Sequence, residues 1–266
     1  MASVVRRTVT GASIGVGVAL LLAAEHAVPG GWVLFVVGAA LLFGCAVEAA
    51  QMGARMGAPA GAALAVAGAG TLALVFPREW FDASAAVRLL AAYGVSAAAA
   101  VALARARPAA VFLAVWLAPP FAALMLLTRE HGLAALIWLL VLSKVGDVAG
   151  YFGGKSFGRT HPFPRLSPGK TTEGCLASLL AGLAVGAAAG AAGWLPGGAS
   201  LVGGLVAGGV LNVAAQAGDL VESAVKRRAG VKDSGPWMGA SGGLLDVVDS
   251  VLLTAPVAWA AAWLLL

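Results

Sequence analysis

Charged side chains are scarce in this sequence. Only 11% of its 266 residues are charged, whereas charged residues make up about a quarter of an average soluble domain. Hydrophobic residues account for 61% of the chain. This balance excludes an ordinary soluble domain and indicates an integral membrane protein.

Cysteine and histidine are also rare, which limits the chemistry available. The two cysteines, Cys45 and Cys175, both lie in apolar stretches, so the sequence predicts neither a disulfide framework nor a cysteine metal cluster. The three histidines lie near the ends of apolar stretches or in a loop beside prolines. None of them is placed to suggest a zinc site or a general base.

Long apolar runs are abundant. Windows long enough to cross a hydrocarbon core of roughly 30 Å as a helix recur along the chain, and they lack the two-residue alternation of barrel strands. We therefore predict an all-α, polytopic membrane protein with about nine transmembrane helices. The predicted spans are residues 9–27, 31–49, 58–76, 85–104, 109–127, 132–153, 172–193, 200–225 and 240–265.

The loops between these spans differ in positive charge, and this difference predicts the orientation. Short cytoplasmic loops accumulate Lys and Arg. With a cytoplasmic N-terminus, the loops on the opposite side hold only Arg78 and Arg129. The cytoplasmic segments then hold Arg6, Arg7, Arg55, Arg105, Arg107, Lys155, Arg159, Arg165, Lys170, Lys226, Arg227, Arg228 and Lys232. We predict this orientation, so the net charge of +5 reflects topology and does not indicate a nucleic-acid partner.

The twelve acidic residues fall into two groups. Five lie at span ends or in short loops, where a solvated or interfacial role is expected: Glu25, Glu48, Glu79, Asp82 and Glu130. Seven lie near the cytoplasmic ends of the last four spans or in the loops between them: Asp147, Glu173, Asp219, Glu222, Asp233, Asp246 and Asp249. Ionisable groups at membrane depth are costly and are seldom retained without a partner or a function. These seven acids therefore mark a candidate site.

The last two spans carry acids at helical spacing. Asp219, Glu222 and Lys226 stand three and four residues apart, so they share one helical face. Asp246 and Asp249 are again three residues apart on the last span. We predict that these two faces converge and present their carboxylates to one site.

The sixth span and the connection after it add further polar groups. Lys144 and Asp147 are three residues apart on that span. The connection ends in PGKTTEG, where Lys170 offers a cation and Thr171 and Thr172 are expected to cap the seventh helix. Free amides at a helix N-terminus favour an anion, although a basic loop of this kind also suits anionic lipid headgroups.

Carboxylates beside cations suit phosphoryl or nucleotidyl transfer. Mg²⁺ binds through one or two carboxylates and the substrate phosphates, and such catalysis consists mostly of positioning and charge stabilisation. A structural alternative is that Asp219 pairs with Lys226 or Lys144 and that the other acids are interfacial. An ion-coupled transporter is a further alternative, because intramembrane Lys and Asp residues also form ion paths.

The C-terminal half resembles the phosphatidate cytidylyltransferase family, also called CDP-diacylglycerol synthases. The family signature corresponds here to SAVKRRAGVKDSGPWMGASGGLLDVVDS, residues 223–250, and the stretches DVAGYFGGKSFGRT, LSPGKTTEG and GDLVES match its other motifs. Two positions depart from it: Ser241 stands where the family usually has His, and Val247 where it usually has Arg. The match covers about residues 140–250.

The resemblance implies an activity, its partners and its location. CTP and phosphatidate would give CDP-diacylglycerol and pyrophosphate for phospholipid biosynthesis, with Mg²⁺ as cofactor. The enzyme would be integral to a bacterial-type inner membrane with its active site on the cytoplasmic side. A second cation and a homodimer remain open, as does a related enzyme acting on another lipid or isoprenoid phosphate or alcohol.

The roles expected of the site residues follow from the motifs and their charges. The catalytic group is expected to comprise Asp219, Lys226, Arg227, Asp246 and Asp249. The metal is expected to be held by Asp219, Glu222, Asp246 and Asp249. Substrate contacts are expected from Lys144, Asp147, Lys170, Thr171, Ser223, Lys232 and Asp233. Residues 131–266 would thus form the catalytic region, and the role of residues 1–130 stays open.

Overall fold

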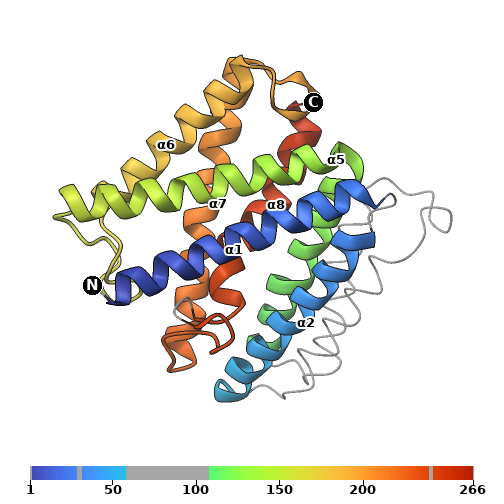
Figure 1. The fold of residues 1–266 in the computed structure, drawn as a ribbon. Coiled ribbons are helices and arrows are strands. Elements are labelled where there is room, and N and C mark those ends of the chain that lie inside the picture. Colours follow the sequence, from blue (N-terminus) through green and yellow to red (C-terminus); the bar gives the residue numbers. More distant parts are fainter. Residues whose placement is uncertain (1, 29–31, 58–107, 240–241, 266) are drawn as a thin grey trace. The chain divides into compact units, whose positions relative to one another are not determined.

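The described part of the chain is entirely helical. The computed structural model describes residues 2–28, 32–57, 108–239 and 242–265, and these ranges contain no strand (Figure 1). The helices are α1 (Ala2–Ala27), α2 (Trp32–Arg55), α5 (Pro108–Phe157), α6 (Thr172–Ala191), the short η2 (Pro196–Gly198), α7 (Leu201–Arg228) and α8 (Leu245–Leu265). The prediction of an all-α fold is confirmed for these residues.

Five of the described helices contain segments long and apolar enough to cross a membrane. They are Val36–Arg55, Pro119–Phe157, Thr172–Ala191, Leu201–Arg228 and Leu245–Ala262. The apolar part of α1, Gly15–Ala27, is shorter than these. The spans expected at 58–76 and 85–104 lie outside the described residues, so the count of nine stays a prediction. The chain is a helical membrane protein.

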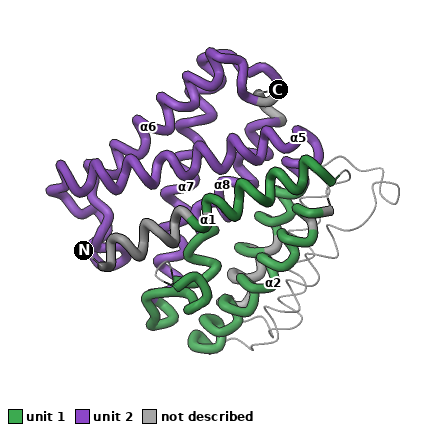
Figure 2. Tube along the Cα trace, in the orientation of Figure 1, with its two compact units in different colours: residues 1–125, 228–248 green, residues 126–227, 249–266 purple. Residues whose placement is uncertain are grey.

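The chain divides into two compact units, which we describe separately (Figure 2). Unit 1 comprises residues 1–125 and 228–248, and unit 2 comprises residues 126–227 and 249–266. The proposed division of roles between residues 1–130 and 131–266 stays a prediction.

Unit 1 is built around one face of α2. Cys45, Ala46 and Ala49 on this face are fully buried. Gly44 packs so closely against Leu244 and Trp237 that a Cβ there would collide with the Leu244 side chain. The apolar face of α2 therefore packs against the segment that leads into α8.

Helix α5 breaks at a glycine. The sequence predicts two spans separated by residues 128–131, but the helix continues through these residues and breaks at Gly132, whose φ of 79° and ψ of 177° are non-helical. A positive φ is accessible to glycine because it has no Cβ. The predicted break is confirmed, with its position shifted to Gly132.

In unit 2, α6 and α7 meet through glycines. A Cβ on Gly186 would collide with the carbonyl oxygen of Gly204, and one on Gly208 would collide with that of Gly182. Small residues allow two membrane helices to approach until their backbones touch. The Gly-rich character of both helices thus serves their packing.

Two further close approaches join α5, α7 and α8 in unit 2. A Cβ on Gly218 of α7 would lie 2.6 Å from the carbonyl oxygen of Asp249. A Cβ on Gly146 of α5 would collide with the side-chain amide of Asn212. Each contact lies next to an acidic residue, so the packing brings Asp147, Asp219 and Asp249 toward the same region.

Candidate functional site

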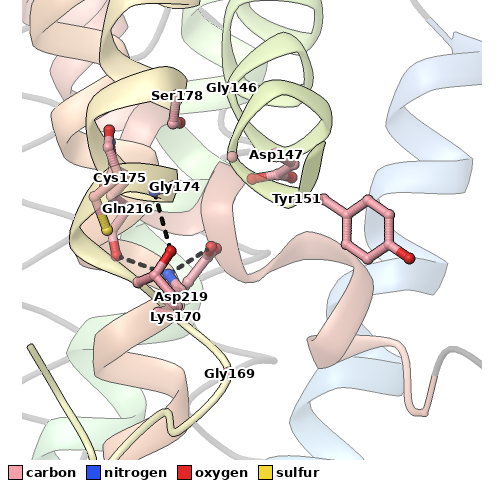
Figure 3. A pocket seen from close by; sticks show the side chains of 12 residues that line it. Gly146, Asp147, Tyr151, Gly169, Lys170, Gly174, Cys175, Ser178, Gln216 and Asp219 are labelled. Atoms are coloured by element: carbon pink, nitrogen blue, oxygen red, sulfur yellow. Dashed lines mark hydrogen bonds and ion pairs between the residues drawn. The ribbon is translucent and has the colours of Figure 1, made fainter. Parts of the chain in front are cut away.

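A cavity of about 260 Å³ opens in unit 2 between α5, the loop before α6, the first turns of α6, and α7. Its charged lining residues are Asp147, Lys170 and Asp219 (Figure 3). All three were predicted from the sequence as site residues. The cavity therefore gathers side chains from segments that are far apart in the chain.

Asp219 is held by a lysine from the loop before α6. The Lys170 ammonium lies 3.0 Å from Asp219 Oδ2, and Figure 3 shows the two groups pointing toward each other. This partner differs from Lys226 and Lys144, the two that were considered from the sequence. Asp219 Oδ1 is buried and has no hydrogen-bond partner among the described residues. One oxygen of this carboxylate is thus available for a ligand.

Lys226 forms a separate pair farther along α7. Its ammonium lies 2.5 Å from Oε2 of Glu222, whose side chain is only 1% exposed. The spacing of four residues explains this contact, because such side chains are neighbours on a helix. The face predicted from the sequence therefore carries two distinct ion pairs, one at Asp219 and one at Glu222.

Helices α5 and α8 are linked beside this cavity. Lys144 Nζ donates to Asp147 Oδ2 at 3.1 Å and to Ser250 Oγ at 2.8 Å. Asp249 lies within electrostatic range of Asp219 and Lys144. The predicted convergence of acids from the last two spans is therefore supported for Asp219 and Asp249.

The loop before α6 is fixed by capping bonds. Thr171 is the N-cap of α6, and its buried hydroxyl accepts the N–H of Gly174 at 3.1 Å. Thr172, also expected to be a cap, is the first residue of the helix. Glu173 accepts the backbone N–H of Arg159 at 3.0 Å. The same turn that fixes the loop therefore places Lys170 over the cavity.

A hydrogen-bonded polar network between α6 and α7 adjoins the cavity, whose lining includes Ser178 and Gln216. Asn212 is fully buried, and its amide donates to Ser178 Oγ at 3.0 Å. The Gln216 amide donates to Asn212 Oδ1 at 2.7 Å and to the Cys175 carbonyl at 3.2 Å. Buried polar groups of this kind rigidify a site when their partners are present. Ser178 was not predicted as a site residue, because it lies in an otherwise apolar span.

The other predicted site residues are not among those that line this cavity of unit 2. Arg227 is exposed, and its Nε donates to the carbonyl of Leu166 in the loop before α6 at 3.3 Å. Ser223 does not line the cavity. Lys232 and Asp233 belong to unit 1 and are exposed. The catalytic role of Arg227 and the substrate-binding roles of Ser223, Lys232 and Asp233 stay predictions.

Asp246 also belongs to unit 1, where its side chain accepts hydrogen bonds at the start of α8. Its Oδ2 accepts the Ser234 N–H at 2.8 Å and the Gly243 N–H at 2.6 Å, and it lies 2.9 Å from the Ser234 hydroxyl, whose single proton it shares with Glu48. The last span was expected to begin at residue 240, but α8 begins at Leu245. Gly242 precedes it with a φ of +87°, a value outside the helical region.

Glu48 overturns an expectation. It was expected in a solvated or interfacial position, yet it is only 1% exposed. Its carboxylate accepts hydrogen bonds from Ser234, Leu244 and Leu245. Only its place among apolar neighbours in FGCAVEAA hinted at burial. Glu48 therefore contacts the signature segment directly, although the sequence did not predict this.

The predicted metal ligands are acidic side chains of α7 and α8. Within the described ranges, no three His, Cys, Asp or Glu side chains are grouped to hold a metal ion. Mg²⁺ nevertheless needs only one or two carboxylates when substrate phosphates and water complete its shell. Asp219 Oδ1, which is buried and has no hydrogen-bond partner among the described residues, fits this requirement. The four-carboxylate set stays a prediction.

Comparisons with known proteins agree with the motifs. A sequence model described as the cytidylyltransferase family matches residues 5–265. A phosphatidate cytidylyltransferase of Helicobacter pylori strain J99 is 40% identical over 135 residues, which cover 51% of this chain and 49% of that protein. Its counterpart in Mycobacterium leprae is 39% identical over 153 residues, covering 57% of this chain and 48% of that protein.

An uncharacterised protein of Escherichia coli K12, YnbB, is similarly related. It is 39% identical over 128 residues, which cover 48% of this chain and 42% of YnbB. The chain thus spans about half the length of the curated relatives it matches. The family match, by contrast, runs through nearly the whole chain, and the chain belongs to the cytidylyltransferase family.

Proposed function

We propose that this protein transfers a cytidylyl group from CTP to phosphatidate, giving CDP-diacylglycerol and pyrophosphate. The observation that carries the proposal is the cavity in which Lys170 lies against Asp219, with Asp147 on the same lining. The family match and the names of the relatives support it. The product would enter phospholipid biosynthesis.

The reaction is a displacement at the α-phosphorus of CTP. An oxygen of the phosphatidate phosphate forms a bond to this phosphorus, and the bond from phosphorus to the oxygen that bridges to the β-phosphate breaks. Pyrophosphate leaves with the electron pair. A phosphate monoester is largely ionised near pH 7, since its second pKa is about 6. No strong general base is therefore needed, which agrees with the lack of a histidine in the cavity lining.

The charged residues of unit 2 would bind and orient the two phosphates. Lys170 reaches the cavity from a capped loop, so its ammonium can move from Asp219 to a phosphate oxygen without rebuilding the loop. Lys144, which donates hydrogen bonds to Asp147 and Ser250, adds positive charge next to Asp147. Preorganised charges of this kind stabilise developing negative charge.

We assign the cofactor Mg²⁺ to the carboxylates of Asp219 and Asp249. Asp219 offers a buried oxygen without a hydrogen-bond partner among the described residues, and Asp249 lies within electrostatic range of it. When bound, the ion would neutralise triphosphate charge. Glu222 and Asp246 remain predicted ligands. A second cation is an extension of this proposal.

The location of the protein forms part of the proposal. The named relatives are bacterial, and the Lys and Arg asymmetry of the loops favours a cytoplasmic N-terminus. We therefore place the protein in a bacterial inner membrane, with its site where cytosolic CTP meets a lipid phosphate. A homodimer stays a prediction.

The proposal is tested with purified full-length protein and CTP labelled in its cytidine. The label should enter a lipid-soluble product when phosphatidate and Mg²⁺ are both present, and pyrophosphate should appear in equal amount. Other acceptors, such as an isoprenoid phosphate and an isoprenoid alcohol, are assayed beside phosphatidate. Labelled product from one of these alone would mean that this acceptor, and not phosphatidate, is the substrate. The reaction class would be unchanged.

Failure to turn over CTP with any acceptor would refute the enzymatic proposal. The same preparation in sealed vesicles, assayed for proton or cation flux, then tests the transporter alternative. Flux that depends on Lys144 and Asp219 would support that alternative.

A further inference from the structure

A carboxylate from the N-terminal part of the chain is buried inside the C-terminal signature segment. Glu48 lies on α2 and is only 1% exposed. Its Oε1 accepts the Leu244 N–H at 3.0 Å, and its Oε2 accepts the Leu245 N–H at 3.0 Å and the Ser234 hydroxyl at 2.8 Å. All three donors lie within the signature, about two hundred residues away in sequence.

Glu48 provides hydrogen-bond acceptors for backbone N–H groups at the start of α8. The first N–H groups of a helix have no partner within it, and they carry partial positive charge. Glu48 accepts the N–H of Leu245, the first residue of α8, and that of the residue before it. A buried carboxylate is retained only when it is paired and hydrogen-bonded. Glu48 and the start of α8 therefore depend on each other.

Ser234 joins this contact to a predicted catalytic acid. Its hydroxyl lies 2.8 Å from Glu48 Oε2 and 2.9 Å from Asp246 Oδ2. Its backbone N–H donates to the same Asp246 oxygen at 2.8 Å. The serine thus touches both carboxylates and limits the orientations open to Asp246.

Close packing leaves little freedom in this cluster. A Cβ on Gly243 would collide with Ser234 Oγ and with the Glu48 carboxylate, and one on Gly235 would collide with Glu48 as well. The two glycines therefore allow the signature segment to wrap directly around the carboxylate. A shorter or uncharged side chain at position 48 would leave donors without a partner, which is costly in a buried site.

We propose that Glu48 is a positioning residue for the reaction, which fixes Asp246 through Ser234 and through the first turn of α8. The proposal rests on the proposed function for the role of Asp246. It also gives the N-terminal helices a role in the reaction, because α2 supplies a group that holds the signature in its working conformation.

The test uses the full-length chain with Glu48→Gln, which keeps the shape of the side chain and removes its charge. We expect kcat to fall by roughly 10- to 100-fold, the size found when a group that orients a ligand side chain is lost. The KM for CTP should change far less, and the Mg²⁺ concentration for half-maximal rate should rise. Ser234→Ala should give a similar profile.

A double-mutant cycle distinguishes positioning from general destabilisation. The loss in Glu48→Gln combined with Ser234→Ala should be clearly smaller than the product of the two single losses, because both act through Asp246. Hydrogen–deuterium exchange of the segment 242–250 should accelerate in Glu48→Gln without any substrate or metal. This readout does not depend on activity.

Glu25→Gln is the matched control. Glu25 also accepts a backbone N–H, that of Leu34 at 2.8 Å, but it does not contact the signature in the hydrogen bonds described. It should retain wild-type kcat and exchange. If Glu48→Gln fails to fold, Ser234→Ala carries the kinetic test, because it leaves Glu48 and its two backbone donors in place.

Three results would overturn the proposal: wild-type kcat in Glu48→Gln, activity lost only in proportion to the folded fraction, or unchanged exchange at 242–250. An inactive wild-type protein would instead count against the proposed function. In that case faster exchange in Glu48→Gln would still show that Glu48 holds the start of α8.

Discussion

At the scale of single residues, the site depends on where each charge finds its partner. Asp219 has one oxygen on Lys170 and one buried oxygen without a hydrogen-bond partner among the described residues. The Glu222 carboxylate has its Oε2 against Lys226 on the same helix. Their spacing predicted that Asp219, Glu222 and Lys226 share one face of the helix. It could not reveal that a lysine from a loop 49 residues away in sequence reaches Asp219.

Replacing Lys170 should mainly weaken nucleotide binding. Lys170→Met removes the cation that lies over the cavity, so the KM for CTP should rise by about 10-fold or more, as expected when a charge-assisted hydrogen bond is lost. Steady-state kinetics with varied CTP measure this change. Lys155→Met removes an exposed lysine of α5 that lies over the Tyr151 ring and serves as control. An unchanged KM in Lys170→Met would remove Lys170 from the nucleotide site.

At the scale of helices, glycine governs how closely the elements approach. Gly186 of α6 faces the backbone of Gly204 and Gly208 on α7. Gly186→Leu should therefore destabilise the protein by at least about 1–3 kcal/mol, the usual cost of overpacking. Thermal unfolding in detergent, followed by the loss of monodisperse protein, measures the effect.

Gly17→Leu provides the comparison for this variant. Gly17 lies on α1, and a Cβ there would meet nothing within 4 Å. It should leave the unfolding temperature nearly unchanged. Equal stability of both variants would contradict the backbone contact between α6 and α7.

Helical elements were largely predictable, but their exact limits were not. Apolar runs marked α6 and α7 closely, because length and hydropathy suffice for a membrane helix. The last span was placed five residues early, at residue 240, whereas α8 begins at Leu245, after Gly242 with its positive φ. The cap at Thr171 was predicted correctly from its position before the helix.

At the scale of the whole molecule, the sequence predicted the acids of the site but not the role of Glu48. Asp219 and Asp249 stood out because charge is rare in the last spans. Glu48 did not, because its hydrogen-bond donors lie in the distant segment 234–245, and such a contact leaves no local pattern. Long-range partners of this kind require a structure.

The orientation in the membrane can be tested by cysteine labelling. With Cys45 and Cys175 replaced by alanine, Ser167→Cys lies in the loop before α6 and Ala199→Cys lies just before α7. The charge asymmetry of the loops predicts that residue 167 is cytoplasmic and residue 199 is on the other side. A membrane-impermeant thiol reagent should label Ala199→Cys in intact cells and Ser167→Cys only after lysis. The reverse pattern would invert the proposed topology.

The most direct test of the proposed reaction concerns the acids of α7 and α8. Asp219→Asn and Asp249→Asn are compared with wild type in the Mg²⁺-dependent transfer of the labelled cytidylyl group from CTP to phosphatidate. Arg228→Ala, which changes an exposed arginine, is the control. We expect a loss of about 100-fold or more in both acid variants, as when a preorganised electrostatic group is removed, and near-normal transfer in the control. Near-normal transfer in both folded acid variants would contradict the assignment of these acids to the active site.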